Sequence, residues 1–184
     1  MYQLDYTIQV AGTYLLEIMV QPGGTGPFYH IKDSNLVVVC AVNEVDAANT
    51  ELSGEGVTDS MAGVVASFTV TLFDVGQNQR ESGGDSILVE ISDGVLDISA
   101  IEVFDNSDGT YTVDYRIDVA TTYTLQVTVN GDIDNIKSST ITTVPNIPDA
   151  ATSTLATVTP ILQDSYTAVD VVVYDAYSNL IQGE

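Results

Sequence analysis

The residues best suited to chemistry in this chain are acidic side chains in short polar turns. Residues 105–109, DNSDG, place carboxylate and amide oxygens close together, and Ca²⁺ prefers such ligands. The run lacks the bidentate Glu that an EF-hand loop carries at its twelfth position, which here is Arg116. Asn, Asp and Gly also suit a hairpin turn, because they tolerate left-handed backbone. We therefore interpret residues 105–109 as a hairpin turn, with a calcium loop as the alternative.

A second set of acidic residues, Glu44, Asp46 and Asp149, lies in two segments of similar sequence. If these segments join neighbouring domains, their carboxylates meet the acidic loops of the neighbour, and divalent cations or high salt would offset the repulsion. A solvated acidic surface explains the same residues. Divalent cations at such junctions are therefore a candidate, and no other cofactor is indicated.

The chain offers little material for catalysis, because it holds one Cys and one His. Metal–thiolate, Cys–His and Ser–His–Asp sites need more of these residues than are present. Cys40 lies in an apolar run, so we expect a buried side chain in a strand, with a crosslinking thiol as the alternative. His30 follows Phe28 and Tyr29 in a Gly-rich segment and is expected to be exposed. The sequence predicts a protein that is not an enzyme.

The overall charge excludes several classes of partner. Acidic residues outnumber basic ones 26 to 4, which gives a net charge of −22. A nucleic-acid-binding face needs clustered Lys and Arg, and an anionic membrane surface attracts basic segments, so neither partner is expected. Hydrophobic residues make up 45% of the chain, as in ordinary folded proteins. The longest apolar run, residues 36–42, is far shorter than the roughly 18 residues of a membrane helix, so no membrane insertion is predicted in this segment.

The elements that must position these residues are β-strands. Residues 66–72, ASFTVTL, alternate apolar and hydroxyl side chains with the two-residue period of a half-buried strand. The same period recurs at residues 87–91, 111–117 and 123–129, and turn-forming clusters of Gly, Asp, Asn and Ser separate these runs. No segment has convincing helical spacing. We therefore predict an all-β fold built from antiparallel β-sandwiches.

An internal repeat organises the chain. Residues 5–16 match residues 114–125, with Tyr14 aligned to Tyr123, and residues 68–74 match residues 169–175. The period is about 100 residues, the size of one immunoglobulin-like sandwich. In such a sandwich, Tyr14 and Tyr123 correspond to the tyrosine corner, whose hydroxyl bonds to nearby backbone.

The phase of the repeat predicts three units. Residues 43–147 form a complete repeat, residues 1–42 correspond to the C-terminal part of one, and residues 148–184 correspond to the N-terminal part of the next. We expect a window from a longer tandem array. The alternative is a short protein whose incomplete ends pair between molecules by strand donation.

The central unit resembles a known family. Residues 104–115, FDNSDGTYTVDY, are similar to the Asp-Asn-Gly-Asp-Gly-Thr-Tyr-x-Val-x-Tyr segment of the filamin-type immunoglobulin repeat. Residues 53–56 (SGEG) resemble the Gly-x-Gly of that family, and Phe68 followed by Asp74 and Gly76 resembles its second strand. The resemblance implies a tandem array of sandwiches.

The resemblance also implies an edge that accepts a peptide. Some filamin repeats add a partner peptide as an extra strand beside their third and fourth strands, where main-chain groups are unpaired. The residues that correspond to this edge are Ile87, Val89, Ile91, Ile101 and Val103. In the other interpretation, Glu90 and Glu102 protect the edge by repulsion.

The leading functional hypothesis is a structural segment of a long rod or filament, whose partners are neighbouring repeats of the same or an identical chain. Pro145 and Pro148 would stiffen the linker between two units. The alternative is an adhesion or scaffold module that binds a protein peptide by β-strand addition at the third-strand edge. The acidic surface favours an extracellular or cell-surface location, whereas the resemblance favours a cytoskeletal or ciliary one.

Overall fold

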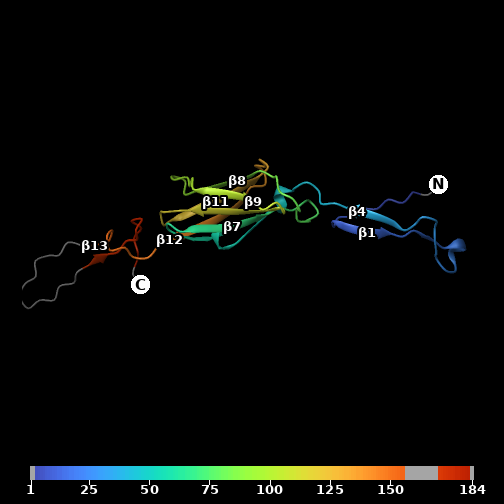
Figure 1. The fold of residues 1–184 in the computed structure, drawn as a ribbon, viewed down its shortest axis with the longest axis horizontal. Helices are drawn as coiled ribbons and strands as arrows, with labels where there is room; N and C mark the ends of the chain where they lie inside the picture. The colour runs from blue at the N-terminus through green and yellow to red at the C-terminus, as the bar shows by residue number, and fades with distance from the viewer. Residues whose placement is uncertain (1–2, 156–169, 183–184) are drawn as a thin grey trace, which may run out of the picture.

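The structure is a computed structural model that describes residues 3–155 and 170–182. Its elements follow one another along one long axis, with a sandwich in the middle and smaller strand pairs on either side (Figure 1). The end residues 1–2 and 183–184 and residues 156–169 of the predicted third unit lie outside the described residues, and so does the start of the repeat match at residues 169–175.

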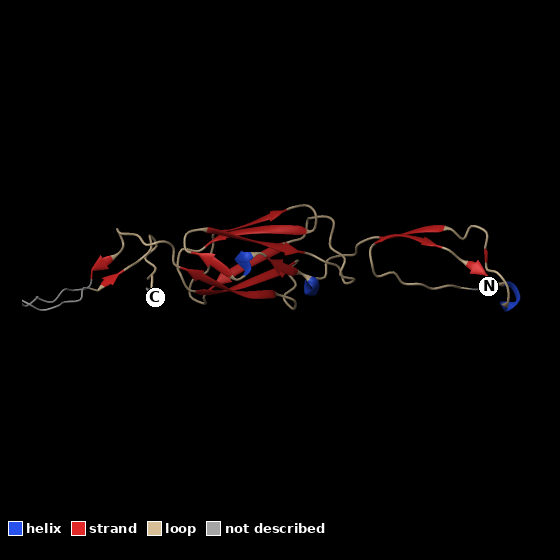
Figure 2. Cartoon of the chain, turned by 90° about the horizontal axis from the view of Figure 1, so that it is seen from below, coloured by secondary structure: helices blue, strands red, loops and turns tan. Residues whose placement is uncertain are grey.

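Two four-stranded sheets pack face to face in the central sandwich (Figure 2). The strand order of the first sheet is β5 (Glu51–Ser53), β7 (Val65–Thr71), β10 (Thr110–Arg116) and β9 (Ile101–Asp105). The order of the second sheet is β6 (Asp59–Met61), β12 (Lys137–Val144), β11 (Thr122–Val129) and β8 (Ile87–Ser92). All pairs are antiparallel except β6 and β12, which run parallel.

The alternating side chains place the core between the two sheets. Along β7, Phe68 and Val70 are buried while Thr69 faces outward, as the two-residue period predicts. The fully buried side chains of the core come from both sheets: Phe68, Val70, Leu72, Ile91, Val113, Tyr115, Ile117, Tyr123, Leu125, Val127, Val129 and Ile141. The predicted all-β sandwich is confirmed.

Smaller strand pairs flank the sandwich. On the N-terminal side, β1 (Gly12–Leu16) pairs with β4 (Leu36–Cys40), and β2 (Met19–Val20) pairs with β3 (Tyr29–His30). On the C-terminal side, β13 (Thr154–Leu155) pairs with β14 (Val171–Val172). The internal repeat is visible in the register, because Tyr14 lies opposite Val38 as Tyr123 lies opposite Ile141. The unit boundaries at residues 42/43 and 147/148 stay predictions.

The helical content of the described chain is limited to three 3-10 turns. These are η1 (Pro22–Gly24), η2 (Ala47–Asn49) and η3 (Glu55–Val57). Within residues 3–155 and 170–182, none of them approaches the length and apolar character of a membrane-crossing helix.

Candidate functional site

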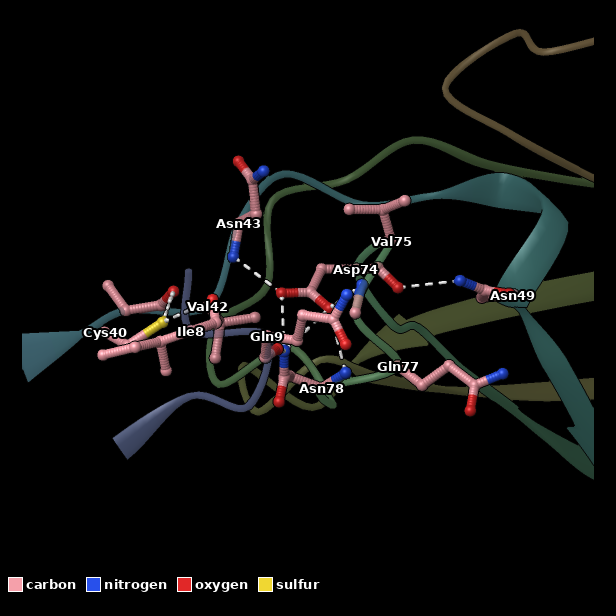
Figure 3. Close-up of a pocket in the computed structure, with 12 residues that line it drawn as sticks. Ile8, Gln9, Cys40, Val42, Asn43, Asn49, Asp74, Val75, Gln77 and Asn78 are labelled. Atoms are coloured by element: carbon pink, nitrogen blue, oxygen red, sulfur yellow. Dashed lines mark hydrogen bonds between the residues drawn. The ribbon is translucent and has the colours of Figure 1, made fainter. Parts of the chain in front are cut away.

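The carboxylate of Asp74 is buried at the N-terminal end of the sandwich and accepts several hydrogen bonds (Figure 3). Its Oδ2 accepts the backbone N–H of Asn43 at 2.9 Å. Its Oδ1 accepts the backbone N–H groups of Gly76 and Asn78 at 2.8 and 2.9 Å, and the side-chain amide of Asn78 donates to both oxygens at 3.0 and 3.1 Å. We call Asp74 and Asn78 the first clamp.

The loop after β7 shapes this clamp. A bridge between Phe73 and Gln79 closes the loop, and the backbone N–H of Asp74 donates to the carbonyl of Asn78 at 2.9 Å. The turn places Gln77 at a positive φ of 60°. This geometry folds Asn78 back over Asp74, so that its side-chain amide lies against the Asp74 carboxylate.

The side chain of Asn78 hydrogen-bonds to the segment that leads into β1. Its Nδ2 donates to the carbonyl of Gln9 at 2.9 Å, and its Oδ1 accepts the backbone N–H of Ala11 at 2.8 Å. One side chain therefore satisfies both a backbone acceptor and a backbone donor of a segment more than sixty positions earlier. The first clamp ties the β1–β4 part to the sandwich.

The same arrangement recurs at the other end of the sandwich. Asp175 is fully buried, and its Oδ2 accepts the backbone N–H of Asn146 at 2.8 Å. Its Oδ1 accepts the backbone N–H groups of Tyr177 and Asn179, both at 2.9 Å, and its Oδ2 accepts the side-chain amide of Asn179 at 2.9 Å. We call Asp175 and Asn179 the second clamp.

The second clamp also reaches across a junction. Nδ2 of Asn179 donates to the carbonyl of Asp118 at 2.8 Å, and its Oδ1 accepts the backbone N–H of Ala120 at 2.7 Å. Asp118 and Ala120 precede β11 as Gln9 and Ala11 precede β1. The two clamps therefore join equivalent pieces of the repeat with the same atoms.

Hydrogen bonding keeps both clamp carboxylates ionised. Burial is the largest single influence on Asp74 and pushes its pKa upward, but the bonds from Asn43, Asn78 and Gly76 together bring the pKa below its ordinary value of 3.8. Burial likewise pushes the pKa of Asp175 upward, and the bonds from Asn179, Asn146 and Tyr177 outweigh it. Each clamp therefore needs a charged carboxylate.

The clamps differ at the position two residues after the aspartate. The first clamp has Gly76, where an added Cβ would lie 2.6 Å from the carbonyl oxygen of Gln9. The second clamp has Tyr177, whose ring lies against Gly63, so that a Cβ on Gly63 would lie 2.0 Å from ring carbons. Only glycine therefore fits at Gly76 and at Gly63 with these neighbours in place.

The side chain of Arg116 stabilises the second clamp through Tyr177. The guanidinium carbon of Arg116 lies 5.5 Å from the centroid of the Tyr177 ring, and Nη2 of Arg116 donates to the Tyr177 hydroxyl at 3.2 Å. Nε of Arg116 also pairs with Asp118 at 2.9 Å. In the linker, the side chain of Asn146 donates to the carbonyl of Ala62 at 2.9 Å.

An open hollow of about 700 Å³ lies beside the first clamp (Figure 3). Cys40 lines it, with its Sγ 3.8 Å from the carbonyl oxygen of Ile8. The prediction that Cys40 lies in a strand is confirmed, since it ends β4, but its side chain is half-buried rather than buried. The two-stranded β1–β4 sheet covers only part of the Cys40 side chain.

The acidic residues proposed as cation ligands make bonds within their own turns. Asp46 accepts the backbone N–H of Ala48 at 3.1 Å and the amide of Asn49 at 3.2 Å, and Asp149 accepts the backbone N–H of Ala151 at 3.2 Å. Glu44 is exposed. Among the described residues, no three His, Cys, Asp or Glu side chains gather in a way that could hold a metal ion.

Three sequence predictions about single sites are confirmed. Residues 105–109 turn the chain from β9 to β10, with Asp105 accepting the N–H of Ser107 at 2.7 Å. The Tyr14 and Tyr123 hydroxyls donate to backbone carbonyls four residues earlier, at 2.7 and 3.1 Å, as a tyrosine corner does. His30 is exposed.

The predicted peptide edge consists of two strands from different sheets. β8 ends the second sheet and β9 ends the first sheet. The edge residues differ in burial: Val89 and Ile91 are in the core, Ile87 and Ile101 are half-buried and pack against it, and Val103 is exposed. Peptide binding at this edge stays a prediction.

Sequence reasoning missed the clamps. The matched segments 68–74 and 169–175 each end in an aromatic residue followed by Asp, at Asp74 and at Asp175. The overlooked signal is an Asn four residues after each of these aspartates, together with Asn43 and Asn146 at the start of the linkers.

Comparison with known proteins adds a family. The family model described as Filamin/ABP280 repeat matches residues 44–146. The E3 ubiquitin-protein ligase TRIM71 of Xenopus tropicalis is 37% identical over 119 residues, which cover 64% of this chain and 14% of that protein. TRIM71 of Mus musculus is 38% identical over 87 residues, or 47% of this chain and 10% of that protein. The chain thus spans a small part of these relatives.

Solved structures share the fold. Invasin, a bacterial integrin-binding protein, superposes with a TM-score of 0.61 and 21% identity, over 83% of this chain and 32% of that one. The Escherichia coli adhesin FdeC gives a TM-score of 0.56 and 18% identity, over 91% of this chain and 52% of that one. At these identities the likeness concerns the fold alone.

Proposed function

The chain belongs to the family of Filamin/ABP280 repeats, and from this membership we propose that it is a segment of a long rod in which such repeats stack end to end. In such an array each repeat contacts mainly its neighbours, and the contacts between neighbours set the stiffness. The role is structural, since repeats of this family are typically non-catalytic. In this proposal, residues 43–147 are one complete repeat between parts of two others.

The observation that carries the proposal is the recurrence of the clamp. Asp74 with Asn78, and Asp175 with Asn179, bind the same backbone atoms of the preceding part and of the linker at both ends of one sandwich. A repeated joint is what an array needs, because the same interface must form at every step. Each joint uses a charged, buried carboxylate, and bonds to such groups are among the strongest hydrogen bonds in proteins.

The linkers restrict the joints further. Asn146 is bonded through its backbone N–H to Asp175 and through its side chain to Ala62, so it is fixed on both sides of the second junction. Pro145 and Pro148 flank it and limit the backbone φ. These contacts favour a stiff connection over a flexible tether.

The proposal is tested by measuring how narrowly the first joint is held. Spin labels at Thr13 in β1 and Gln126 in β11, both exposed, report the distance across the joint in a Cys40→Ser background. We expect a single narrow distance distribution in this background. Asn78→Ala removes both bonds to the preceding segment, so we expect a distribution at least twice as broad.

Asn106→Ala is the matched control, because the described hydrogen bonds of Asn106 go only to Thr110 and Thr112 of β10, away from the joint. It should leave the distribution unchanged. An Asn78→Ala chain that keeps the narrow distribution, with its β-sheet circular dichroism intact, would refute the stiff joint.

Peptide binding at the β8 and β9 edges is the second candidate function. The observation that favours it is that both strands are outermost in their sheets, with the predicted residue Val103 exposed and with Leu88 and Phe104 exposed beside the predicted residues. Exposed Glu90 and Glu102 oppose it. A panel of extended peptides, assayed by NMR shifts of the β8 and β9 amides, decides between peptide binding and a protected edge. If peptides add as a strand, Val103→Lys should abolish the shifts. Val95→Lys, in the β8–β9 connection, should leave them unchanged.

A further inference from the structure

The hollow beside the first clamp lies at a free strand edge (Figure 3). Its lining includes Ile8, Cys40, Ala41 and Asn43, and Cys40 is the last residue of β4. Within the described residues, β4 pairs with β1 along one edge, and its other edge is open to a further strand. We call Ile8, Cys40, Ala41 and Asn43 the open site.

The second joint contains an equivalent of each residue of the open site. The strand register, in which Tyr14 matches Tyr123, and the bonding pattern of the two clamps fix the alignment. The equivalents of Ile8, Cys40, Ala41 and Asn43 are, in that order, Ile117, Thr143, Val144 and Asn146. The second joint therefore shows what such a set of residues binds.

One bound element at the second joint is the strand β6. It runs parallel to β12, along the edge that corresponds to the free edge of β4. The backbone N–H of Thr142 donates to the carbonyl of Thr58 at 2.7 Å, and the Ser60 and Thr143 hydroxyls lie 2.8 Å apart. Each of these bonds joins β12 to the segment that contains β6.

The other bound element is the turn that follows β6. The backbone N–H of Ala62 donates to the carbonyl of Val144 at 2.9 Å, and the next N–H, of Gly63, donates to the carbonyl of Ile117 at 2.7 Å. The carbonyl of Ala62 accepts the side-chain amide of Asn146 at 2.9 Å. Two carbonyls and one amide thus bind the backbone of a two-residue turn.

The open site presents the same groups with only weak partners. Among the described hydrogen bonds, the carbonyls of Ile8 and Ala41 accept only the Cys40 thiol, at 3.8 and 4.0 Å, and a thiol is a weak donor. Nδ2 of Asn43 donates no described hydrogen bond. Thr143, which β6 covers, is 3% exposed, whereas Cys40 is half-buried.

We propose that the open site binds a strand and its following turn from a partner polypeptide, as the second joint binds β6 and its turn. The partner strand runs parallel to β4. Its turn supplies two successive N–H groups and one carbonyl, in place of those of Ala62 and Gly63. The inference rests on the repeat equivalence used for the proposed function and not on the stiffness of the joints.

The turn after β6 defines the sequence that fits. Ala62 is completely buried, so the first turn position takes a small side chain. Gly63 has a φ of 75°, a backbone region that favours glycine. The partner segment is therefore a short strand followed by a small residue and a glycine. Main-chain hydrogen bonds supply most of its affinity, as in other cases of strand addition.

The structure favours another polypeptide over a second copy of this chain. Residues 59–62 of the chain are already bound to β12, so a second copy could offer them only by opening its own sandwich. At the second joint the Tyr177 ring lies against Gly63. The equivalent position at the open site is Gly76, which has no side chain, so a bound turn stays uncovered and can exchange.

Amide NMR of the full chain, titrated with a synthetic peptide of residues 57–65 (VTDSMAGVV), tests the proposal. The titration is run in 300 mM NaCl, which screens repulsion between the acidic chain and the peptide. We expect shifts at Val39, Ala41 and the side-chain amide of Asn43. Methylation of the Gly63 nitrogen in the peptide removes one turn donor and should raise the dissociation constant about tenfold.

Proline substitutions in β4 test the strand contact. Val39 is the equivalent of Thr142, so Val39→Pro removes the N–H that faces the partner strand and should weaken peptide binding about fivefold. Val37→Pro is the matched control. Its N–H lies on the same edge two residues earlier, but the equivalent residue of β12 has no partner in β6. Because an edge strand tolerates proline, Val37→Pro should keep the dissociation constant within about twofold.

A gain of affinity provides an independent test. Cys40→Thr installs the hydroxyl that Thr143 offers to Ser60, so it should lower the dissociation constant of the peptide about threefold. A peptide with Ser60→Ala lacks the partner hydroxyl and should bind the Cys40→Thr chain no more tightly than the wild type. This pair of comparisons isolates one contact.

Four results would overturn the proposal. They are a millimolar peptide that shifts none of these amides, equal binding of the methylated peptide, equal binding by Val39→Pro and Val37→Pro, and shifts confined to β8 and β9. The last result would assign the peptide to the other predicted edge. None of them bears on the stiffness of the first joint, which Asn78→Ala tests separately.

Discussion

At the scale of single residues, the clamps show how a buried charge is accommodated without a counter-ion. Removing an unpaired carboxylate from water is costly, and several donors must take over the role of the lost solvent. Asp74 obtains these donors from three backbone N–H groups and one side-chain amide, which come from Asn43 in the linker and from Gly76 and Asn78 in the loop after β7. The carboxylate thereby holds the linker and positions Asn78, whose side chain binds the preceding segment.

Replacing the carboxylate of Asp74 by an amide should therefore weaken the structure. In Asp74→Asn the new NH₂ group faces N–H donors, and at least one donor is left unsatisfied. We expect a loss of about 2 kcal/mol in the free energy of unfolding, typical for a hydrogen bond to a charged group. Urea denaturation followed by circular dichroism measures it. Asp97→Asn, on an exposed side chain in the β8–β9 connection, should cost less than about 0.5 kcal/mol.

The clamp carboxylates also predict how stability depends on pH. The pKa values of Asp74 and Asp175 are below 3.8 in the folded chain, so the unfolded chain takes up protons first as the pH falls. Their contribution is present above about pH 4 and is lost as the pH falls through the folded pKa values. Urea midpoints between pH 5.5 and 2.5 should fall steeply for the wild type and less steeply for Asp74→Asn. Parallel curves would contradict this assignment.

At the scale of elements, the turn between β6 and β7 shows how a glycine supports the second joint. Gly63 has a φ of 75°, a backbone region that favours glycine, and the Tyr177 ring occupies the space of its missing side chain. Gly131 in the β11–β12 turn has nearly the same φ of 74° but no atom within 4 Å of its missing Cβ. The two glycines differ only in what lies next to them.

Alanine at these two positions should separate backbone strain from steric conflict. Both substitutions should cost about 1 kcal/mol of stability through the left-handed backbone. Only Gly63→Ala should also displace Tyr177, which would shift the NMR signal of the Asn179 side-chain amide. An unchanged Asn179 signal in Gly63→Ala would mean that the ring and the clamp are independent.

The elements were more predictable from sequence than the joints. Alternation such as that of residues 66–72 identifies a half-buried strand directly, and the turn at residues 105–109 is recognisable from its composition. The clamps depend on where the linker passes: Asp74 meets Asn43 only after the chain has folded. Alternation also does not tell which sheet a strand joins, so the sequence did not show that β8 and β9 lie in different sheets.

At the scale of the whole molecule, the dominant property is uncompensated negative charge. The chain has a net charge of −22. The two described ion pairs, Arg80 with Asp85 and Arg116 with Asp118, neutralise only a small part of the negative surface charge. Self-repulsion of this size keeps chains apart and lowers the stability of the compact state. Both effects are screened by salt.

Salt should therefore stabilise the chain without regard to the identity of the cation. We expect the thermal midpoint to rise by several degrees between 10 and 300 mM NaCl, and CaCl₂ at equal ionic strength to give the same rise, because screening depends on ionic strength. Differential scanning calorimetry makes the comparison. A larger rise with Ca²⁺ would instead support the candidate cations at the junctions around Glu44, Asp46 and Asp149.

The parallel pairing of β6 with β12 has a consequence for a chain pulled from both ends. These strands lie near the start and the end of the sandwich and run side by side, with Asp59, Ser60 and Met61 opposite Thr142, Thr143 and Val144. Tension at the two ends of the chain loads this pair of strands in shear. All contacts between the two strands, including the 2.8 Å hydrogen bond between the Ser60 and Thr143 hydroxyls, then bear the force together. They must break at the same time rather than one after another. A sandwich closed in this way resists extension along the axis on which the flanking strand pairs lie (Figure 1).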